Sequence, residues 1–255
     1  MSFLADSRPC AGCRGLRGPI CDRCRPAFVG PVYRVDRPGV LTMPVVATAV
    51  YEGPVREALV AFKDHGRWSL RDPLGLALYR SVFGLVRAKV RQGLQAQGEV
   101  LPDDPDEPTV LDYPPEPIGD LLRVLLVPVP SSAGSVRARD ADHVSELAER
   151  VEELLPRGAD TLPGLVVVRR RRDQVGLGRR ARAANLHGSM RATDVLVRRA
   201  ARPGTAVVLV DDIVTTGASL AEAHRALVAA GIRPWGAAVV AATPDLPRRG
   251  RPAAR

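Results

Sequence analysis

Hydrophobic and polar positions follow two different periods along the chain, and these periods predict alternating strands and helices. Short runs rich in β-branched residues have the length and composition of buried strands; they are Val45–Tyr51, a run from Leu121, a run from Gly164, and Val207–Val210. Apolar residues at helical spacing predict amphipathic helices; these are one carrying Val55, Leu59 and Phe62, one over about 69–90, one over His143–Leu154, and one from Ala218 that ends at Gly231. The pattern favours an α/β fold with a mostly parallel central sheet flanked by helices.

Two segments interrupt this alternation and suggest how the chain is divided. Residues 92–119 are rich in proline and acidic residues and lack periodicity, which is typical of a flexible surface insertion. The last residues, 246–255, form a basic tail. With 255 residues, the chain is long enough for one α/β domain and a small appendage. We expect a cysteine-containing unit over 1–40 and the α/β domain over 41–245.

The formal net charge of +9 favours anionic partners such as nucleotide phosphates, pyrophosphate or nucleic acid. Arginine supplies nearly all of the positive charge, and lysine occurs only at Lys63 and Lys89. Two interpretations of Lys63 are equally compatible with the sequence: an exposed lysine at a helix end that complements the helix dipole, and a functional residue. No run of about 18 apolar residues occurs, and the first residues lack the features of a signal peptide. We therefore expect a cytoplasmic protein without membrane insertion.

The four cysteines form two C-x-x-C pairs within the first 24 residues: Cys10, Cys13, Cys21 and Cys24. Two such hooks joined by a short linker can present four thiolates to one tetrahedral ion, so the pattern predicts a structural zinc knuckle. Two disulfides are disfavoured in a reducing cytosol, and a redox pair lacks the surrounding βαβ pattern. An iron–sulfur cluster is the remaining metal-bound alternative. Four cysteine ligands leave no open position for a catalytic zinc.

The most informative stretch, VVLVDDIVTTGASL over 207–220, places two carboxylates and a small-residue turn between a strand and a helix. The turn, residues 215–219, offers hydroxyls and unobstructed N–H groups where the helix dipole favours an anion, so a phosphate fits there. Asp211 and Asp212 would repel phosphate, and they therefore suit sugar hydroxyls or magnesium. Together these features indicate a ribose-phosphate ligand. Strand, acidic turn and helix cap also occur together in many α/β proteins without a ligand, where Asp, Thr and Ser satisfy free N–H groups.

Other nucleotide-binding motifs are missing from the sequence. There is no G-x-x-x-x-G-K-[ST] phosphate loop and no complete G-x-G-x-x-G after a strand. The 207–220 stretch instead closely resembles the signature for phosphoribosyl pyrophosphate (PRPP) in type I phosphoribosyltransferases. The resemblance implies a type I phosphoribosyltransferase-like fold and a PRPP site that uses magnesium. It assigns the site to Val210, Asp211, Asp212, Val214, Thr215, Thr216, Gly217, Ala218 and Ser219.

A second turn follows the strand from Leu121, as Pro130, Ser131 and Ser132. If both strands are parallel, the two turns open at the same edge of the sheet, which favours a second phosphate-binding loop over a simple strand end. Arg137 and Arg139 can then face pyrophosphate. Residues 169–182 hold seven arginines against one aspartate. This run fits a loop that closes over pyrophosphate, a solvated loop, or a nucleic-acid patch, and its composition does not separate these roles.

The order of motifs along nearly the whole chain resembles the ComF family of competence-associated, phosphoribosyltransferase-like proteins. The matching elements are the four-cysteine knuckle, Tyr51–Gly66, Val127–Ser131, Arg137–Arg139, Gln174–Gly188 and the PRPP loop. The resemblance implies that Lys63, Gln174, Arg182 and Asn185 contribute to the pocket or close a loop over it. It also implies a link to DNA uptake, with single-stranded DNA and competence or DNA-processing proteins as partners.

These observations predict a protein that binds PRPP and magnesium and transfers the phosphoribosyl group with release of pyrophosphate, as a transferase of nucleotide metabolism. Asp211 and Asp212 are the candidate catalytic residues, because they would hold the ribose hydroxyls and offset positive charge in the transition state. The acceptor is not readable from the sequence. The alternative is a non-catalytic module that keeps the fold as a scaffold and binds single-stranded DNA.

Overall fold

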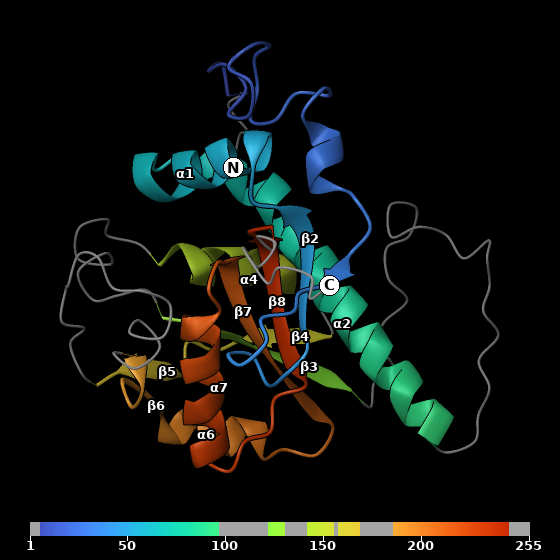
Figure 1. Cartoon of the computed structure of the whole chain (residues 1–255), viewed down its shortest axis with the longest axis vertical. Coiled ribbons are helices and arrows are strands. Elements are labelled where there is room, and N and C mark those ends of the chain that lie inside the picture. Colours follow the sequence, from blue (N-terminus) through green and yellow to red (C-terminus); the bar gives the residue numbers. More distant parts are fainter. Residues whose placement is uncertain (1–5, 97–121, 131–141, 156–157, 169–185, 245–255) are drawn as a thin grey trace, which may run out of the picture.

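The centre of the protein is a six-stranded, mostly parallel sheet (Figure 1). This computed structural model describes residues 6–96, 122–130, 142–155, 158–168 and 186–244. In spatial order the strands are β1 (Tyr33–Arg34), β2 (Val45–Val50), β8 (Gly236–Ala242), β7 (Thr205–Val214), β3 (Arg123–Pro128) and β4 (Ala159–Thr161). Neighbouring strands from β2 to β4 are parallel, and only β1 pairs antiparallel, at the edge beside β2. The expectation of an α/β fold with a mostly parallel sheet is confirmed.

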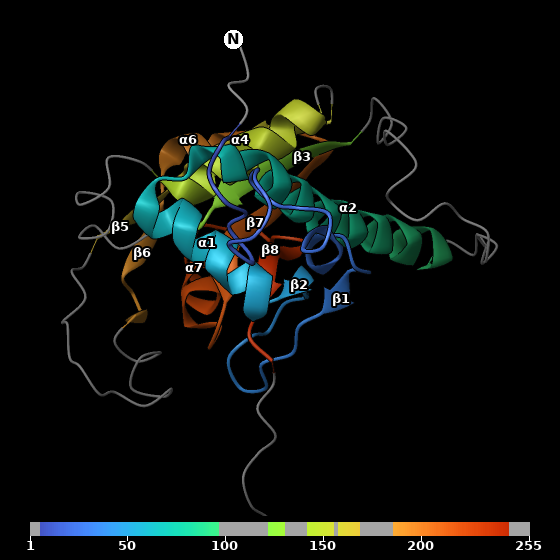
Figure 2. The ribbon, with the colours of Figure 1, turned by 90° about the horizontal axis from the view of Figure 1, so that it is seen from above.

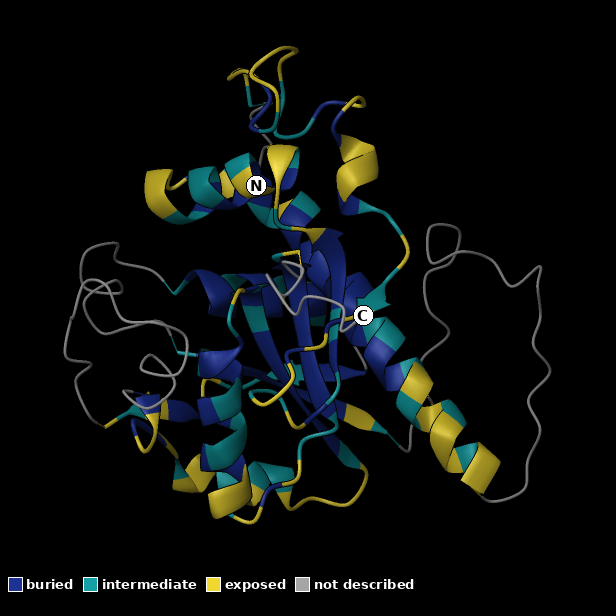
Figure 3. Ribbon diagram, viewed as in Figure 1, coloured by how far each residue is buried: buried dark blue, intermediate teal, exposed yellow. Residues whose placement is uncertain are grey.

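Helices cover both faces of this sheet, which explains why its central strands are mostly apolar. On one face, α1 (Gly53–His65), α2 (Arg71–Ala96) and α4 (His143–Leu154) pack in one hydrophobic cluster. On the other, α6 (Asp194–Ala200) and α7 (Ala218–Ala229) pack in a second cluster. The view from above places α2 and α4 on the side of the strands opposite α7 (Figure 2). The strands between them are almost entirely buried (Figure 3).

Helix α2 differs in extent from the predicted helix over 69–90. A short 3₁₀ turn, η2 (Trp68–Leu70), precedes it, and α2 then continues through Ala96. Residues 92–96 are therefore helical rather than part of an irregular insertion, because the straight-chain residues of this segment favour a helix. The remaining residues of that predicted insertion, and the tail 246–255, lie outside the described residues. In the part of the chain that the structure describes, every helix is too short or too polar to cross a membrane.

The apolar run from Gly164 forms a strand as predicted, but outside the central sheet. It is β5 (Leu165–Val167), which pairs antiparallel with β6 (Met190–Ala192) in a separate hairpin. The buried Glu222 of α7 holds this hairpin, because its carboxylate accepts a hydrogen bond from the Met190 N–H at 2.9 Å. The hairpin packs in the same hydrophobic cluster as α7.

The first residues of the described chain lie against α1 and α2. A Cβ atom at Gly12 would lie 2.8 Å from Pro54 Cβ, so this segment contacts the start of α1 directly. A second attachment comes from the buried Arg80 of α2, which donates to the carbonyls of Val29 and Gly30, just after η1 (Arg25–Phe28). Strand β1 then joins the central sheet, so residues before 40 also contribute to the α/β domain. The unit boundary at residue 40 stays a prediction.

Candidate functional site

The connections of β3 and β7 run in opposite directions. From β3 the chain passes through α4 to β4, and from β7 it passes through α7 to β8 on the other side. Helices α4 and α7 lie on opposite faces of the sheet. In open parallel sheets, a crevice forms at the carboxyl ends of two adjacent strands whose connections diverge in this way, and ligands bind there. The topology therefore points to the ends of β3 and β7.

Strand β7 extends past the end of β3 and carries both predicted carboxylates. Its last residue paired with β3 is Val210, opposite Pro128, whereas Asp211 pairs only with β8, opposite Val239. The sequence pattern ended this strand at Val210, and that boundary is wrong. Aspartate is unfavourable in strands, but pairing with β8 keeps the backbone extended through Val214. The carboxylates thus lie on a strand rather than in a loop.

Asp212 lies on the same face of the sheet as Lys63. Val208 and Val210 contact the cluster containing α1, and the alternation of a strand places Asp212 on that face too. The Asp212 carboxylate is almost fully buried and accepts a hydrogen bond from Lys63 Nζ at 2.6 Å. Lys63 lies near the end of α1, which stops at Gly66 in the left-handed conformation. The structure therefore brings together two residues that are 149 positions apart.

Asp211 lies in a setting that disfavours its charge. Burial and the neighbouring negative charge of Asp212 raise the pKa of the Asp211 carboxyl well above its usual value. The positive charge of Lys63 and the Asp212 N–H, which donates to Asp211 Oδ1 at 2.9 Å, counteract this shift only in part. A carboxyl group whose pKa is shifted by burial and by a neighbouring charge is a recurrent feature of functional sites.

The predicted phosphate loop, residues 215–219, directly follows β7 and leads into α7. Gly217 precedes the first residue of α7 and has φ of 82°, a conformation that side chains other than glycine rarely adopt. The Thr216 hydroxyl accepts a weak hydrogen bond from the Ala218 N–H at 3.4 Å. Thr215 is exposed and Ser219 is partly exposed. The loop is accessible, and it lies next to the carboxylate pair.

Arg37 and Thr243 anchor this loop, and the sequence pattern did not identify either of them. The buried guanidinium of Arg37 donates to the carbonyl oxygen of Thr215 at 2.8 Å and to that of Thr243 at 2.5 Å. The Thr243 N–H in turn donates to the Val214 carbonyl at 3.0 Å. The contacts join positions 178 and 206 residues apart, so no local pattern could reveal them.

The remaining predicted site residues are only partly described. Pro130 follows Val129, whose N–H donates to the Val210 carbonyl at 2.9 Å, so this turn begins beside the carboxylate pair. Its continuation and the arginine-rich segment lie outside the described residues; the site predictions that fall there are Ser131, Ser132, Arg137, Arg139, Gln174, Arg182 and Asn185.

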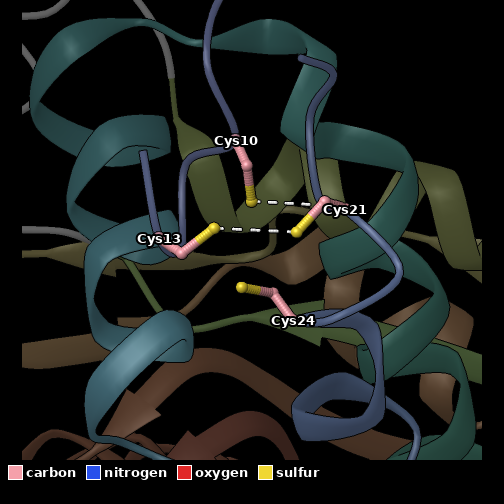
Figure 4. A group of neighbouring side chains, drawn as sticks. All are labelled: Cys10, Cys13, Cys21 and Cys24. Atoms are coloured by element: carbon pink, nitrogen blue, oxygen red, sulfur yellow. Dashed lines mark hydrogen bonds between the residues drawn. The ribbon is translucent and has the colours of Figure 1, made fainter. Parts of the chain in front are cut away.

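The four cysteines form a second candidate site, above α1 (Figures 1 and 4). Their side chains point toward a common centre, and all four Sγ atoms lie within 4.8 Å of one another. The Cys13 and Cys21 sulfurs are 3.7 Å apart. A tetrahedral zinc site with Zn–S bonds of about 2.3 Å places its sulfurs about 3.8 Å apart. None of the four is in a disulfide, and together they can hold a metal such as zinc.

The electrostatics of this cluster distinguish its members. Burial raises the pKa of the Cys10 thiol, but N–H groups of Cys21, Cys13 and Gly12 outweigh burial and lower it to about 6. Burial and the surrounding sulfurs raise the pKa of Cys24 to about 12. A thiolate at one position therefore disfavours ionisation of the neighbouring thiols by electrostatic repulsion. A bound cation would offset this repulsion and stabilise all four thiolates.

Neither a protein-family model nor a curated protein was found to match this chain.

Proposed function

We propose that this protein binds PRPP together with magnesium, as a type I phosphoribosyltransferase-like protein of the ComF kind. The observation that carries the proposal is the carboxylate pair Asp211–Asp212, which lies at the end of a central strand and runs directly into the threonine–glycine loop. The fold alone would not support this assignment, because many functions share the α/β architecture.

Each part of the candidate site fits a different part of PRPP. The loop over 215–219 provides hydroxyls and N–H groups for the 5′-phosphate, and the start of α7 favours its negative charge. Asp211 and Asp212 accept hydrogen bonds from the ribose hydroxyls. Val129, which precedes the predicted Pro130–Ser132 loop, is hydrogen-bonded to Val210 just before the pair, so the loop starts where it would face pyrophosphate.

In the proposed transfer, a bond forms between the acceptor and the anomeric carbon while the bond from that carbon to the pyrophosphate oxygen breaks. Pyrophosphate leaves with the electron pair of the broken bond. Positive charge develops on the ribose in the transition state, and Asp211 and Asp212 stabilise it electrostatically.

The donor sets of the two sites suit two different metals. Carboxylate oxygens beside a phosphate ligand suit magnesium, which would neutralise part of the pyrophosphate charge. The four thiols suit zinc, which would hold the knuckle together without an open coordination position.

The test is calorimetric titration of PRPP into the protein in the presence of magnesium. We expect saturable binding of one PRPP per chain. The absence of binding heat would contradict the proposal. If heat is seen, failure of ribose 5-phosphate to compete with PRPP would contradict it as well. A parallel titration without magnesium should show weaker binding, since the pyrophosphate charge is then not neutralised.

Replacing Lys63 with Gln should weaken PRPP binding about tenfold, because the anionic ligand then loses a nearby positive charge. In the structure, Lys63 Nζ lies 2.6 Å from Asp212 Oδ2. The matched control is Lys89→Gln, which alters the other lysine of the chain; this residue lies on α2, where its Nζ donates to Gln92 Oε1 at 3.5 Å. Unchanged affinity in Lys63→Gln, or an equal loss in both variants, would exclude Lys63 from the site.

A second candidate function is binding of single-stranded DNA at the knuckle. Five arginines of this region are exposed: Arg8, Arg14, Arg17, Arg23 and Arg25. If they contact phosphates, affinity for a single-stranded oligonucleotide should fall steeply with salt, and replacing Arg14 and Arg17 with Gln should reduce the slope of log K against log salt by about 1.4. A fluorescence titration over a salt series measures this slope. Absence of binding at low salt would exclude this candidate.

A further inference from the structure

The segment before β2 contacts the candidate phosphate loop. Besides the hydrogen bonds of Arg37, this segment contributes Leu41, whose side chain lies against Gly217; a Cβ atom built on Gly217 would be 3.0 Å from Leu41 Cδ2. Arg37 has only 8% of its surface exposed. A buried guanidinium is retained only when its donors find acceptors, and here they are backbone carbonyls of two separate segments.

The hydrogen bond from Arg37 to the Thr215 carbonyl determines how the following peptide group is oriented. No cis peptide bond occurs among the described residues, so the Thr215 C=O and the Thr216 N–H point in opposite directions. Because the carbonyl is directed at the guanidinium, the Thr216 N–H is directed away from it. Without that contact, the peptide could rotate and present an oxygen, which repels phosphate, in place of an N–H donor.

The same guanidinium also fixes the end of β8 relative to the end of β7. It reaches both the Thr243 carbonyl and the Thr243 hydroxyl, the latter at 3.2 Å, and that hydroxyl lies 3.4 Å from the Thr215 carbonyl. A planar fork of donors is needed to satisfy both carbonyls at once, and lysine cannot reproduce it.

We propose that Arg37 is a positioning residue of the PRPP site: it fixes the Thr215–Thr216 peptide so that the loop presents N–H groups to the 5′-phosphate. This inference rests on the proposed function. Arg37 itself does not contact the ligand in this proposal, because its guanidinium is buried against the loop carbonyls.

Arg37→Lys tests this role because it keeps the positive charge and removes the fork. We expect PRPP affinity to fall about tenfold or more, since charge-assisted hydrogen bonds to two carbonyls are weakened. The matched control is Arg34→Lys, which alters an exposed arginine of β1 that is paired with Asp36; it should leave affinity unchanged. Equal affinity of Arg37→Lys and wild type would overturn the proposal.

A second measurement separates loop positioning from a general effect on folding and does not need a ligand. In wild type, amide order parameters from ¹⁵N relaxation at Thr215 and Thr216 should be about 0.85, and in Arg37→Lys they should fall toward 0.6 while those of β7 stay unchanged. Unchanged loop order parameters would overturn the role of Arg37. Failure of wild type to bind PRPP would instead overturn the proposed function and, with it, the affinity part of this inference.

Should Arg37→Lys fail to fold, Thr243→Val provides the same test. It removes only the hydroxyl that accepts from Arg37 and lies against the Thr215 carbonyl. We expect a smaller effect, about a threefold loss of PRPP affinity together with lower order parameters at Thr215. Wild-type affinity and wild-type order parameters in a folded Thr243→Val protein would contradict the proposal.

Discussion

Replacing Asp211 with Asn should abolish PRPP binding and at the same time stabilise the folded protein at pH 8. Binding is lost because a neutral amide is a poor ligand for magnesium and a weaker hydrogen-bond acceptor for the ribose hydroxyls than a carboxylate. Stability rises because burial and the charge of Asp212 make the ionised Asp211 carboxylate unfavourable in the folded chain. A residue kept at a cost to stability is expected at a functional site.

The gain in stability should depend on pH with a definite sign. The pKa of Asp211 is higher in the folded chain than in the unfolded chain, so the folded state holds the proton more tightly. Stability therefore decreases as pH rises from the unfolded pKa, about 3.9, through the folded pKa. The Asn variant does not titrate here. Its advantage over wild type should be absent below pH 3.9 and largest above the folded pKa.

Thermal unfolding at pH 4 and pH 8, with calorimetric titration of PRPP and magnesium, measures both effects. For a chain of this size, each kcal/mol added to the free energy of unfolding raises Tm by about 2–4 °C. Asp36→Asn, at an exposed carboxylate paired with Arg34, should change neither property measurably. Asp212→Asn should also abolish binding but lower Tm, because it breaks the contact with Lys63. Retained binding in the Asp211→Asn/Asp212→Asn double variant would contradict the assignment of the site.

Removing the metal from the four-cysteine knuckle should unfold this region and let trypsin bind and cleave the backbone after its already exposed arginines. We expect about one zinc per chain in the purified protein, and none after Cys24→Ser or Cys13→Ser. Cys10, Cys21 and Cys24 form a small cluster of their own with Ile20, so a metal would be the main link among these side chains. Structural zinc contributes folding free energy directly in such small units.

Elemental analysis and limited proteolysis provide the measurement. Trypsin should cleave after Arg14 and Arg17 in the chelator-treated protein and in the Cys24→Ser variant, but not in the zinc-bound protein. The control is Ala27→Ser, a substitution of similar size at an exposed position of η1, which should keep both the zinc and the resistance. Equal resistance with and without chelator would show that the knuckle does not depend on a metal.

The elements with strong periodicity were predictable from the sequence. The predicted bounds His143–Leu154 match α4, and Val55, Leu59 and Phe62 are buried on α1 as their spacing indicated. In α7, Leu220, Ala223 and Leu227 are buried as well. These helices are amphipathic over three turns, and a local pattern of that length is sufficient to define both the helix and its buried face.

Strand β8 was not predicted, because its sequence GAAVVAA is rich in alanine, a residue that disfavours strands. Its seven residues are nevertheless all buried, since β8 lies between β2 and β7 and under helices on both faces. Here tertiary packing outweighs the low strand propensity of alanine. The small side chains are suited to this position, because α2 packs closely over this strand; a Cβ atom at Gly236 would lie 3.0 Å from Leu85 Cδ1.

The candidate site was only partly predictable, for a related reason. The acidic pair and the threonine–glycine loop form one continuous stretch, so their chemistry is visible in the sequence. Arg37 resembles any of the other arginines of this arginine-rich chain until the fold brings it to Thr215. Lys63 stands out as one of two lysines, but only the family resemblance assigns it to the pocket, and its contact with Asp212 depends on α1 lying beside the end of β7.

The position of β8 has a consequence for how the protein is made. This last strand of the described chain lies between β2, one of the first, and β7. While a ribosome is still adding residues before 236, β2 cannot join β7, and the sheet remains divided into two parts. Domains that need such distant pairings form slowly and late. The nascent chain can therefore complete the candidate site only after residue 243 has emerged, so a prematurely terminated product would lack the site even though it contains both aspartates and the whole loop.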